Sequence, residues 1–297
     1  MEDFFVRYRY RNLLYPGGLR KAVTFSYDDG TIHDARLADT FTKYGVKGTF
    51  NLNSRELRAG SAFTDEMIRE HILNAGHEVA VHGYMHSAAG KLRPIECIRE
   101  YLDSRLELEG RFDMIIRGMA YPDSGVNTFN GDMSYAEVKH ILTDIDIAYA
   151  RTTGSKEENF DLPVDWHAWS PNAHHRHPRL FEMIDKFINI DYSNLYISSH
   201  QPRLFYIWGH SYEFNGDNSW DIIERACERF AAAKDQLWFA TNFEIYDYVE
   251  AYRSLVYSAD GMTVYNPTLK TIWFSCDLDV YQIAPGETLK IKEQPGA

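Results

Sequence analysis

Short apolar segments alternate with amphipathic helical segments along most of the 297-residue chain. From His33 to Tyr44 the apolar residues have helical spacing, Gly45 ends the pattern, and a strand-like run from Lys47 to Asn53 follows. Strands that alternate with helices predict a mainly parallel sheet with helical crossovers, which is an α/β fold. We expect further strands at residues 22–25, 79–81, 114–120, 147–150, 204–208 and 236–240, and further helices beginning near residues 64, 95, 134, 178 and 219.

The pattern changes after Tyr252. Short β-like runs at 262–265, 271–275 and 288–291 are separated by turn residues, and about 45 residues are too few for an independent core. We therefore predict a main domain over residues 1–252 and a small antiparallel β appendage over residues 253–297. A carbohydrate-binding strip that uses Tyr265 and Trp273 is the alternative role for the appendage.

Two polar motifs each follow an expected strand directly. Asp28, Asp29 and Gly30 follow the first, and His82 and His86 follow the run 79–81. Taken alone, each motif is also compatible with an ordinary solvated turn or surface pair. However, the carboxyl ends of parallel strands meet at one edge of a sheet, and adjacent carboxylates at a buried strand end repel each other unless a cation is near. One carboxylate with two imidazoles is a common ligand set for Zn²⁺ or a similar ion.

Together these motifs resemble the polysaccharide deacetylases with a NodB homology domain, carbohydrate esterase family 4. The first motif, T-F-D-D-G, has two extra residues here (T-F-S-Y-D-D-G, 24–30), and H-[ST]-x-x-H has Gly83 at its second position; the resemblance covers roughly residues 18–250. It implies a distorted (β/α) barrel that hydrolyses an acetyl group on a sugar. It also implies that Asp29, His82 and His86 hold one divalent transition metal ion, zinc before cobalt or nickel, whose bound water is the nucleophile and has Asp28 as its base.

The third motif of the family corresponds best to residues 120–125, A-Y-P-D-S-G. The resemblance implies that the backbone N–H of Asp123 stabilises the oxyanion and that Tyr121 and Pro122 contact the substrate. Tyr121 stands where the family has the arginine that orients the base. Arg117 or Arg151 could take that role, and a peripheral salt bridge is the alternative for Arg117.

Two later motifs complete the resemblance. Trp208-Gly209-His210 matches the fifth motif, which implies that His210 is the general acid, that Glu213 orients it and that Trp208 lies in the substrate site. Asp165-Trp166 resembles the fourth motif, whose tryptophan helps to form the wall of the acetyl pocket. The nearby histidines form either a solvated rim of the substrate site or a second metal site; they are His167, His174, His175 and His177.

Composition restricts the partners and the compartment. The formal charge of −12 disfavours nucleic acid and anionic membranes as partners. The resemblance implies a carbohydrate substrate. We expect Cys97, Cys227 and Cys276 to be buried, reduced thiols. The acidic N-terminus does not resemble a signal peptide and no apolar run approaches the ~18 residues of a membrane span, so we expect a cytoplasmic protein. The sequence predicts no oligomeric state.

Two rival functions stay open. The same plan allows an amidase that acts on a non-sugar amide or imide. A glycan-binding protein without catalysis is the other rival, although such a protein would not need the complete set of Asp28, Asp29, His82, His86 and His210.

Overall fold

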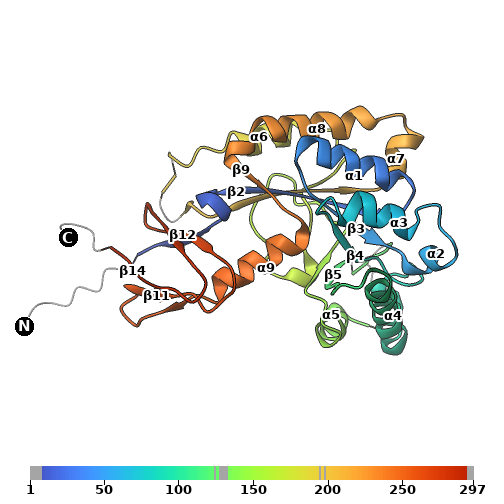
Figure 1. The fold of residues 1–297 in the computed structure, drawn as a ribbon, viewed down its shortest axis with the longest axis horizontal. Coiled ribbons are helices and arrows are strands. Elements are labelled where there is room, and N and C mark those ends of the chain that lie inside the picture. The colour runs from blue at the N-terminus through green and yellow to red at the C-terminus, as the bar shows by residue number, and fades with distance from the viewer. Residues whose placement is uncertain (1–8, 124, 127–132, 194, 197–198, 293–297) are drawn as a thin grey trace, which may run out of the picture.

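The computed structural model describes residues 9–123, 125–126, 133–193, 195–196 and 199–292. Its central sheet has the strand order β6-β5-β4-β3-β2-β8-β7, with β9 also paired to β2, and every pairing in it is parallel (Figure 1). The strands are β2 (Lys21–Asp29), β3 (Gly48–Leu52), β4 (Glu78–Val81), β5 (Gly118–Ala120), β6 (Tyr149–Arg151), β7 (Ala173–His174), β8 (Arg203–Gly209) and β9 (Leu237–Phe239).

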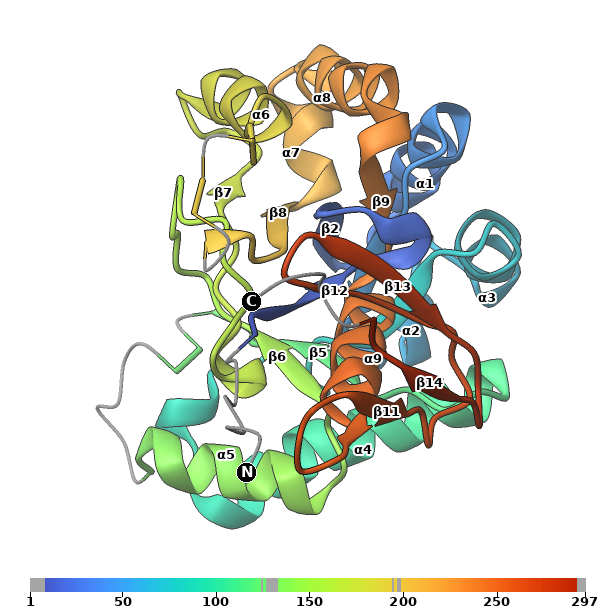
Figure 2. The same ribbon diagram turned by 90° about the vertical axis from the view of Figure 1, so that its left-hand side faces the viewer.

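The sheet curls into a distorted barrel, so that its two edge strands, β6 and β7, approach each other. An isolated bridge joins Arg151, at the end of β6, to Trp169, which lies shortly before β7. Helices surround it (Figure 2). They are α1 (His33–Tyr44), α2 (Ser54–Arg58), α3 (Asp65–Met67, continued by a π-helical turn over Ile68–Leu73), α4 (Pro94–Phe112), α5 (Tyr135–Asp144), α6 (Leu180–Ile188), α7 (Ser211–Gly216), α8 (Trp220–Ala232) and α9 (Asn242–Arg253). The predicted α/β fold of the NodB type is confirmed.

Three helices were not predicted from the sequence: α2, α7 and α9. For α9 a signal was present, because Thr241 and Glu244 form a capping box in which each side chain accepts the other residue's backbone N–H. The strand expected over residues 114–120 is shorter in the structure, where β5 contains only Gly118–Ala120.

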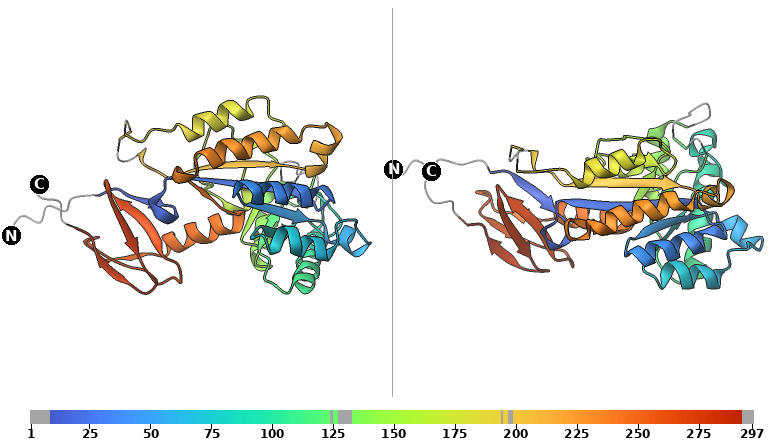
Figure 3. Two further views of the ribbon diagram at one scale, coloured as in Figure 1. Left: turned by 45° about the horizontal axis from the view of Figure 1, so that its top comes forward. Right: turned by 90° about the horizontal axis from the view of Figure 1, so that it is seen from above.

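Two small antiparallel sheets complete the described chain. β1 (Arg11–Leu14) pairs with β12 (Ile272–Cys276), which pairs with β13 (Asp279–Ile283); β10 (Val256–Tyr257), β11 (Thr263–Tyr265) and β14 (Thr288–Lys290) form the other sheet. The N-terminal strand therefore lies with the C-terminal strands (Figure 3). Tyr265 and Trp273 lie in different sheets, so they do not share one sheet face. The division at residue 252 stays a proposal.

A second hydrophobic core joins these sheets to the barrel. Ile272, Phe274 and Ile283 are buried in it together with residues of α9. The hydroxyl of Tyr248, on α9, donates to the carbonyl of Leu14 (3.0 Å) and accepts the N–H of Trp273 (2.9 Å). Cys97, Cys227 and Cys276 are buried free thiols, as predicted. Among the described residues, no helix combines the length and apolarity that a membrane crossing requires.

His77, just before β4, is a buried histidine that belongs to the fold and not to the site. Its Nδ1 accepts the N–H of Gly48 (3.2 Å), which leaves Nε2–H to donate to the carbonyl of Ala38 (3.2 Å), and its ring lies edge-on to Phe41 and Phe50. Burial lowers the pKa of His77 to about 4. The neutral imidazole is therefore the form that the fold stabilises.

This histidine predicts a specific loss of stability in acid. The neutral form is favoured fully above the unfolded pKa of about 6.5, and the stabilisation is lost as the pH falls from there through 4, by at most about 3 kcal/mol. Urea unfolding of wild type and His77→Gln at pH 7 and pH 4.5 checks this: the variant should lose less stability between the two pH values. His140→Gln, at an exposed histidine of α5, is the control and should keep the wild-type difference. Equal pH dependence in all three proteins would contradict the assignment.

Candidate metal centre and active site

The parallel strands bring the two polar motifs to one edge of the sheet. Asp29 ends β2 with its backbone in the left-handed region (φ +81°), and His82 follows β4 directly. One oxygen of Asp29, Oδ1, lies 3.4 Å from Nε2 of His82 and 3.3 Å from Nε2 of His86. Ligands at 2.0–2.1 Å from a tetrahedral zinc ion are separated by about 3.3 Å, which both distances from Asp29 match, and the three ligand atoms lie within 4.8 Å of one another.

The protonation of His82 supplies an independent test of this fit. Its Nδ1 lies 3.0 Å from the carbonyl oxygen of Ala120, so in the neutral ring Nδ1 carries the proton and Nε2 a lone pair. That lone pair faces a carboxylate oxygen of Asp29, and His82 is almost fully buried. Two facing lone pairs repel each other unless a cation or a proton lies between them. A hydrogen bond from the second ring nitrogen is also the usual support of a histidine that binds a metal. The three residues therefore fit a divalent cation.

The charges of this group are strongly coupled. Burial raises the pKa of Asp29, but the contacts with His82 and His86 outweigh burial and hold that pKa well below its usual range. The interaction with Asp29 raises the pKa of His86. Asp29 is therefore an anionic ligand at neutral pH.

Asp28 is buried beside the metal group and is held from both sides. Its Oδ1 accepts a hydrogen bond from the side-chain amide of Asn51 (2.8 Å), and its Oδ2 pairs with the guanidinium of Arg151 and lies 3.9 Å from Nε2 of His82. Arg151 is itself fully buried and stacks over the ring of Trp208, 4.4 Å from its centroid. Asp28 is thus an oriented carboxylate within reach of any group that the metal site holds.

The structure decides between the two arginines that the sequence left open. Arg151, the last residue of β6, pairs with Asp28. Arg117 instead forms an exposed ion pair with Asp146 (2.7 Å), which is the peripheral salt bridge that the sequence allowed as its alternative role. Asn51 was not predicted, although a polar residue in the buried strand from Lys47 to Asn53 was a usable signal.

The third motif follows β5 at the same edge. Asp123 is exposed and has a left-handed backbone (φ +51°), and its N–H donates no hydrogen bond to any described residue. Pro122 lies against the metal loop, since a Cβ at Gly83 would be 3.2 Å from its ring. Tyr121 is fully buried and its hydroxyl donates to the carbonyl of His167 (2.8 Å), so it lies behind the site. Ser124 is outside the described residues.

His210 follows β8 and lies between the two acidic groups of the site. Its Nε2 is 3.9 Å from Oδ2 of Asp29, and its Nδ1 is 3.5 Å from Oε2 of Glu213, at the start of α7. Burial lowers the pKa of His210, but the interaction with Glu213 and the negative charges of Asp28 and Asp29 outweigh it, so the net pKa is raised. Trp208 lies close by, with 5.8 Å between the ring centroids. The histidine therefore presents one nitrogen to the metal group and the other to a carboxylate.

Glu213 also contacts two histidines of the histidine-rich segment, which runs from His167 to His177. Nε2 of His174 lies 3.1 Å and Nε2 of His175 lies 3.3 Å from the same Oε2, while Oε1 accepts from Arg176 (2.8 Å). Burial raises the pKa of Glu213, but its contacts with His174 and His210 hold that pKa well below its usual range. Nδ1 of His174 accepts the N–H of Arg176 (3.2 Å), which puts the ring proton on Nε2, toward Glu213. Protons and Arg176 thus already satisfy this carboxylate, and we expect no second ion here.

The remaining predicted residues lie away from the histidines of the site. Asp165 accepts from Tyr135 (2.8 Å) and Lys139 (2.8 Å) of α5. Trp166 is buried in the second core, and its Nε1 donates to Glu250 of α9 (2.7 Å). The ring of His167 contacts the carbonyl of Ile147, and His177 lies near Glu157, so the four histidines do not form one cluster.

Comparisons with known proteins show similarity to one family over part of the chain. The sequence profile of the polysaccharide deacetylase family matches residues 17–137, which contain Asp28, Asp29, His82, His86 and the third motif. In this segment the chain is similar to the polysaccharide deacetylase family. Arg151, Trp208, His210 and Glu213 lie beyond the matched residues, so the similarity of sequence covers the metal half of the site. No curated protein sequence matches the chain significantly.

Solved structures of this deacetylase fold are similar to the chain at low identity. A Pseudomonas aeruginosa protein named as a polysaccharide deacetylase has a TM-score of 0.60 at 15% identity, with 81% of this chain and 93% of that one covered. A mutant with restored enzymatic activity of a CE4 family pseudoenzyme from Bacillus anthracis has a TM-score of 0.51 at 17% identity, with 80% and 70% covered. The chain spans 55% of the length of the Streptococcus pyogenes deacetylase PplD, over 44% of its own length, at 20% identity and a TM-score of 0.39.

The candidate ligands Asp29, His82 and His86 predict how many metal ions each chain binds. Wild type should bind one divalent transition metal ion per chain, and His82→Ala and His86→Ala should each lower this well below one, because two ligands do not retain an ion that three hold. His174→Ala is the matched control: it removes a histidine of the Glu213 cluster and should keep one ion. Metal analysis of the purified proteins after dialysis measures all four. Two ions in wild type and one in His174→Ala would show that the second cluster also binds metal, against the expectation of a single ion.

Proposed function

We propose that the protein is a metal-dependent hydrolase that removes acetyl groups from N-acetylated sugars, with O-acetylated sugars as the second substrate class. The observation that carries the proposal is the lone pair of His82 Nε2 that faces the Asp29 carboxylate, with the ion-paired Asp28 on one side and His210 on the other. A hydrolase of this class needs an ion, a base, an oxyanion donor and an acid, and the described residues supply a candidate for each role.

The ion, when bound, supplies Lewis acidity and lowers the pKa of a water molecule. A mixed set of imidazole nitrogen and carboxylate oxygen ligands favours zinc, with cobalt and nickel as alternatives. Asp28 would take the proton of the attacking water, and its contact with Arg151 keeps it oriented for that role. The N–H of Asp123, which donates to none of the described residues, would donate to the oxyanion, and His210 would protonate the leaving amine.

Two of the comparisons bear on this proposal. The Pseudomonas relative is named as a deacetylase, and the match of residues 17–137 to that family supports the same activity here. The likeness to a CE4 family pseudoenzyme makes a glycan-binding protein without catalysis the second candidate. A binding protein has no use for a buried, ion-paired Asp28 or for a His210 held between two carboxylates, and for that reason we favour catalysis.

Acetate release tests the proposal directly. The protein, loaded with Zn²⁺, Co²⁺ or Ni²⁺, is incubated with N-acetylated mono- and oligosaccharides, O-acetylated sugars and N-acetyl amides that contain no sugar. Release from the sugars supports the deacetylase, and release from the non-sugar amides alone supports the amidase. Metal binding without release from any substrate, combined with measurable binding of the saccharides, would support the non-catalytic candidate and overturn the proposal.

A further inference from the structure

The loop that contains His82 and His86 needs an anchor, because its backbone turns left-handed at Gly83 and is strained at His86. Gly83 has φ +80° and His86 has φ +58°, so the chain leaves the right-handed region directly after the first ligand and again at the second. A left-handed non-glycine residue is costly and persists only where the surroundings hold it. Something outside the loop must therefore fix the distance between the two imidazoles.

Glu100, on α4, contacts most of this loop. Both of its carboxylate oxygens accept the N–H of Met85 (3.0 Å each), and Oε1 also accepts the N–H of Ser87 (2.9 Å). Its backbone carbonyl accepts the N–H of Tyr84 (2.9 Å). One turn later, the hydroxyl of Ser104 donates to the carbonyl of Gly83 (3.1 Å). This face of α4 thus binds the backbone between the two histidines, and both sides of His86, from outside the site.

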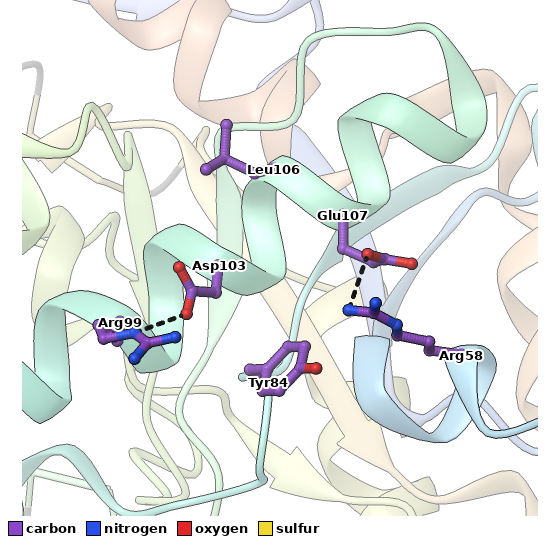
Figure 4. A pocket seen from close by; sticks show the side chains of 6 residues that line it. All are labelled: Arg58, Tyr84, Arg99, Asp103, Leu106 and Glu107. Carbon is purple, nitrogen blue, oxygen red and sulfur yellow. Dashed lines mark hydrogen bonds and ion pairs between the residues drawn. The ribbon is translucent and has the colours of Figure 1, made fainter.

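The position of Glu100 differs from that of its neighbours on the same helix. Arg99 and Asp103 point to the outer surface, where they pair with each other beside the ring of Tyr84 (Figure 4). Glu100 is only 5% exposed and turns inward to the loop. Burial of a carboxylate costs free energy, and hydrogen bonds to a charged acceptor offset it by about 1.5–3 kcal/mol each. The loop amides are the donors whose hydrogen bonds offset the free-energy cost of burying this carboxylate.

Gly83 and Glu100 are complementary in shape. A Cβ at position 83 would lie 2.5 Å from Oε1 of Glu100, so the carboxylate occupies the space that a side chain at residue 83 would take and would have to move to admit one. The departure of this chain from H-[ST]-x-x-H, which has Gly83 at the second position, is therefore linked to the acidic residue on α4.

We infer that Glu100 is a positioning residue for the metal ligands: its carboxylate holds the loop so that His82 and His86 face Asp29. The inference rests on the proposed metal site, but the contact with the loop does not depend on an ion. Glu100→Gln can accept at only one atom and turns an NH₂ group toward N–H donors, and Glu100→Ala removes the contact altogether. Residues that support metal ligands in this way typically contribute 10–100-fold to metal affinity.

Metal affinity and amide exchange together test the inference. Competition with a chelating dye should give a Kd for Zn²⁺ that is about 10–100-fold weaker in Glu100→Gln than in wild type. Hydrogen exchange of the metal-free proteins should show faster exchange at the amides of Met85 and Ser87 in the variant. Glu109→Gln is the matched control, since Glu109 is also on α4 and also accepts a backbone N–H, that of Ile116, outside the loop; it should leave both measurements unchanged.

The outcomes separate this inference from the proposed function. Should Glu100→Gln bind Zn²⁺ as tightly as wild type, or lose only thermal stability, Glu100 has a structural role alone and the inference is overturned while the metal site stands. Should wild type bind none of Zn²⁺, Co²⁺ and Ni²⁺, the proposed function fails, and the exchange data alone then show whether Glu100 holds the loop. If Glu100→Ala does not fold, Glu100→Gln still provides both measurements.

Discussion

Asp28→Asn is expected to lower kcat for deacetylation by roughly 10²–10⁴-fold while the protein keeps its metal ion, because a single general base contributes about that much and Asp28 is not one of the three metal ligands. The substitution preserves the shape of the side chain and one acceptor oxygen. It removes the charge that can accept a proton, and it leaves Arg151 buried beside a neutral partner. Steady-state kinetics with an N-acetylated oligosaccharide and metal analysis of the same sample measure the two quantities.

The buried ion pair makes a stability control necessary for this experiment. Removal of one partner of such a pair typically costs about 3–5 kcal/mol, so Asp28→Asn and Arg151→Met should both unfold at lower urea concentration than wild type. Arg151→Lys retains the charge and should be less destabilised. Asp39→Asn, at an exposed aspartate on α1 that pairs with His71, is the matched control and should change neither kcat nor stability appreciably. An Asp28→Asn protein that is folded, metal-loaded and fully active would exclude Asp28 as the base.

His210→Ala should separate substrates by their leaving groups. Amine leaving groups must be protonated as the C–N bond breaks, so loss of the acid should lower kcat on N-acetylated sugars by roughly 10²–10⁴-fold. An aryl acetate, whose phenolate leaves without a proton, should be affected far less. The variant should keep its metal ion, since His210 Nε2 lies 3.9 Å from the Asp29 oxygen that faces away from His82 and His86. Kinetics on the two substrates and metal analysis test this.

A histidine of similar exposure offers a control. His177→Ala removes a side chain that lies near Glu157, and it should leave both activities near wild type. Glu213→Gln should reduce activity on the amide less than His210→Ala does, because it weakens the orientation of the acid without removing it. An equal loss on both substrate types in His210→Ala, or loss of the metal, would show that His210 is not the acid.

Much of the fold was predictable from the sequence because it is encoded locally. The alternation of strand and helix patterns predicted the parallel sheet, and the bounds of α1 matched the apolar stripe from His33 to Tyr44 closed by Gly45. The polar residues that end β2 and follow β4 and β8 could be placed at one edge of the sheet from the sequence, because parallel strands all end on the same side. The pairing of β1 with β12 could not, because it joins segments some 260 residues apart that no local pattern relates.

The sequence alone therefore determined which strand ends bear polar groups, and with them the candidate ligands Asp29, His82 and His86. Only the tertiary structure decided which distant groups support them. Arg151 and not Arg117 pairs with Asp28, although the pair joins strands β6 and β2, which are separated in the sheet by three others. Glu100 likewise gains its role from the loop that the fold places beside it. Strand and helix patterns arise from residues that are neighbours along the chain. The partner of a buried charge is instead determined by the packing of segments far apart in the chain, and a single sequence does not record that packing.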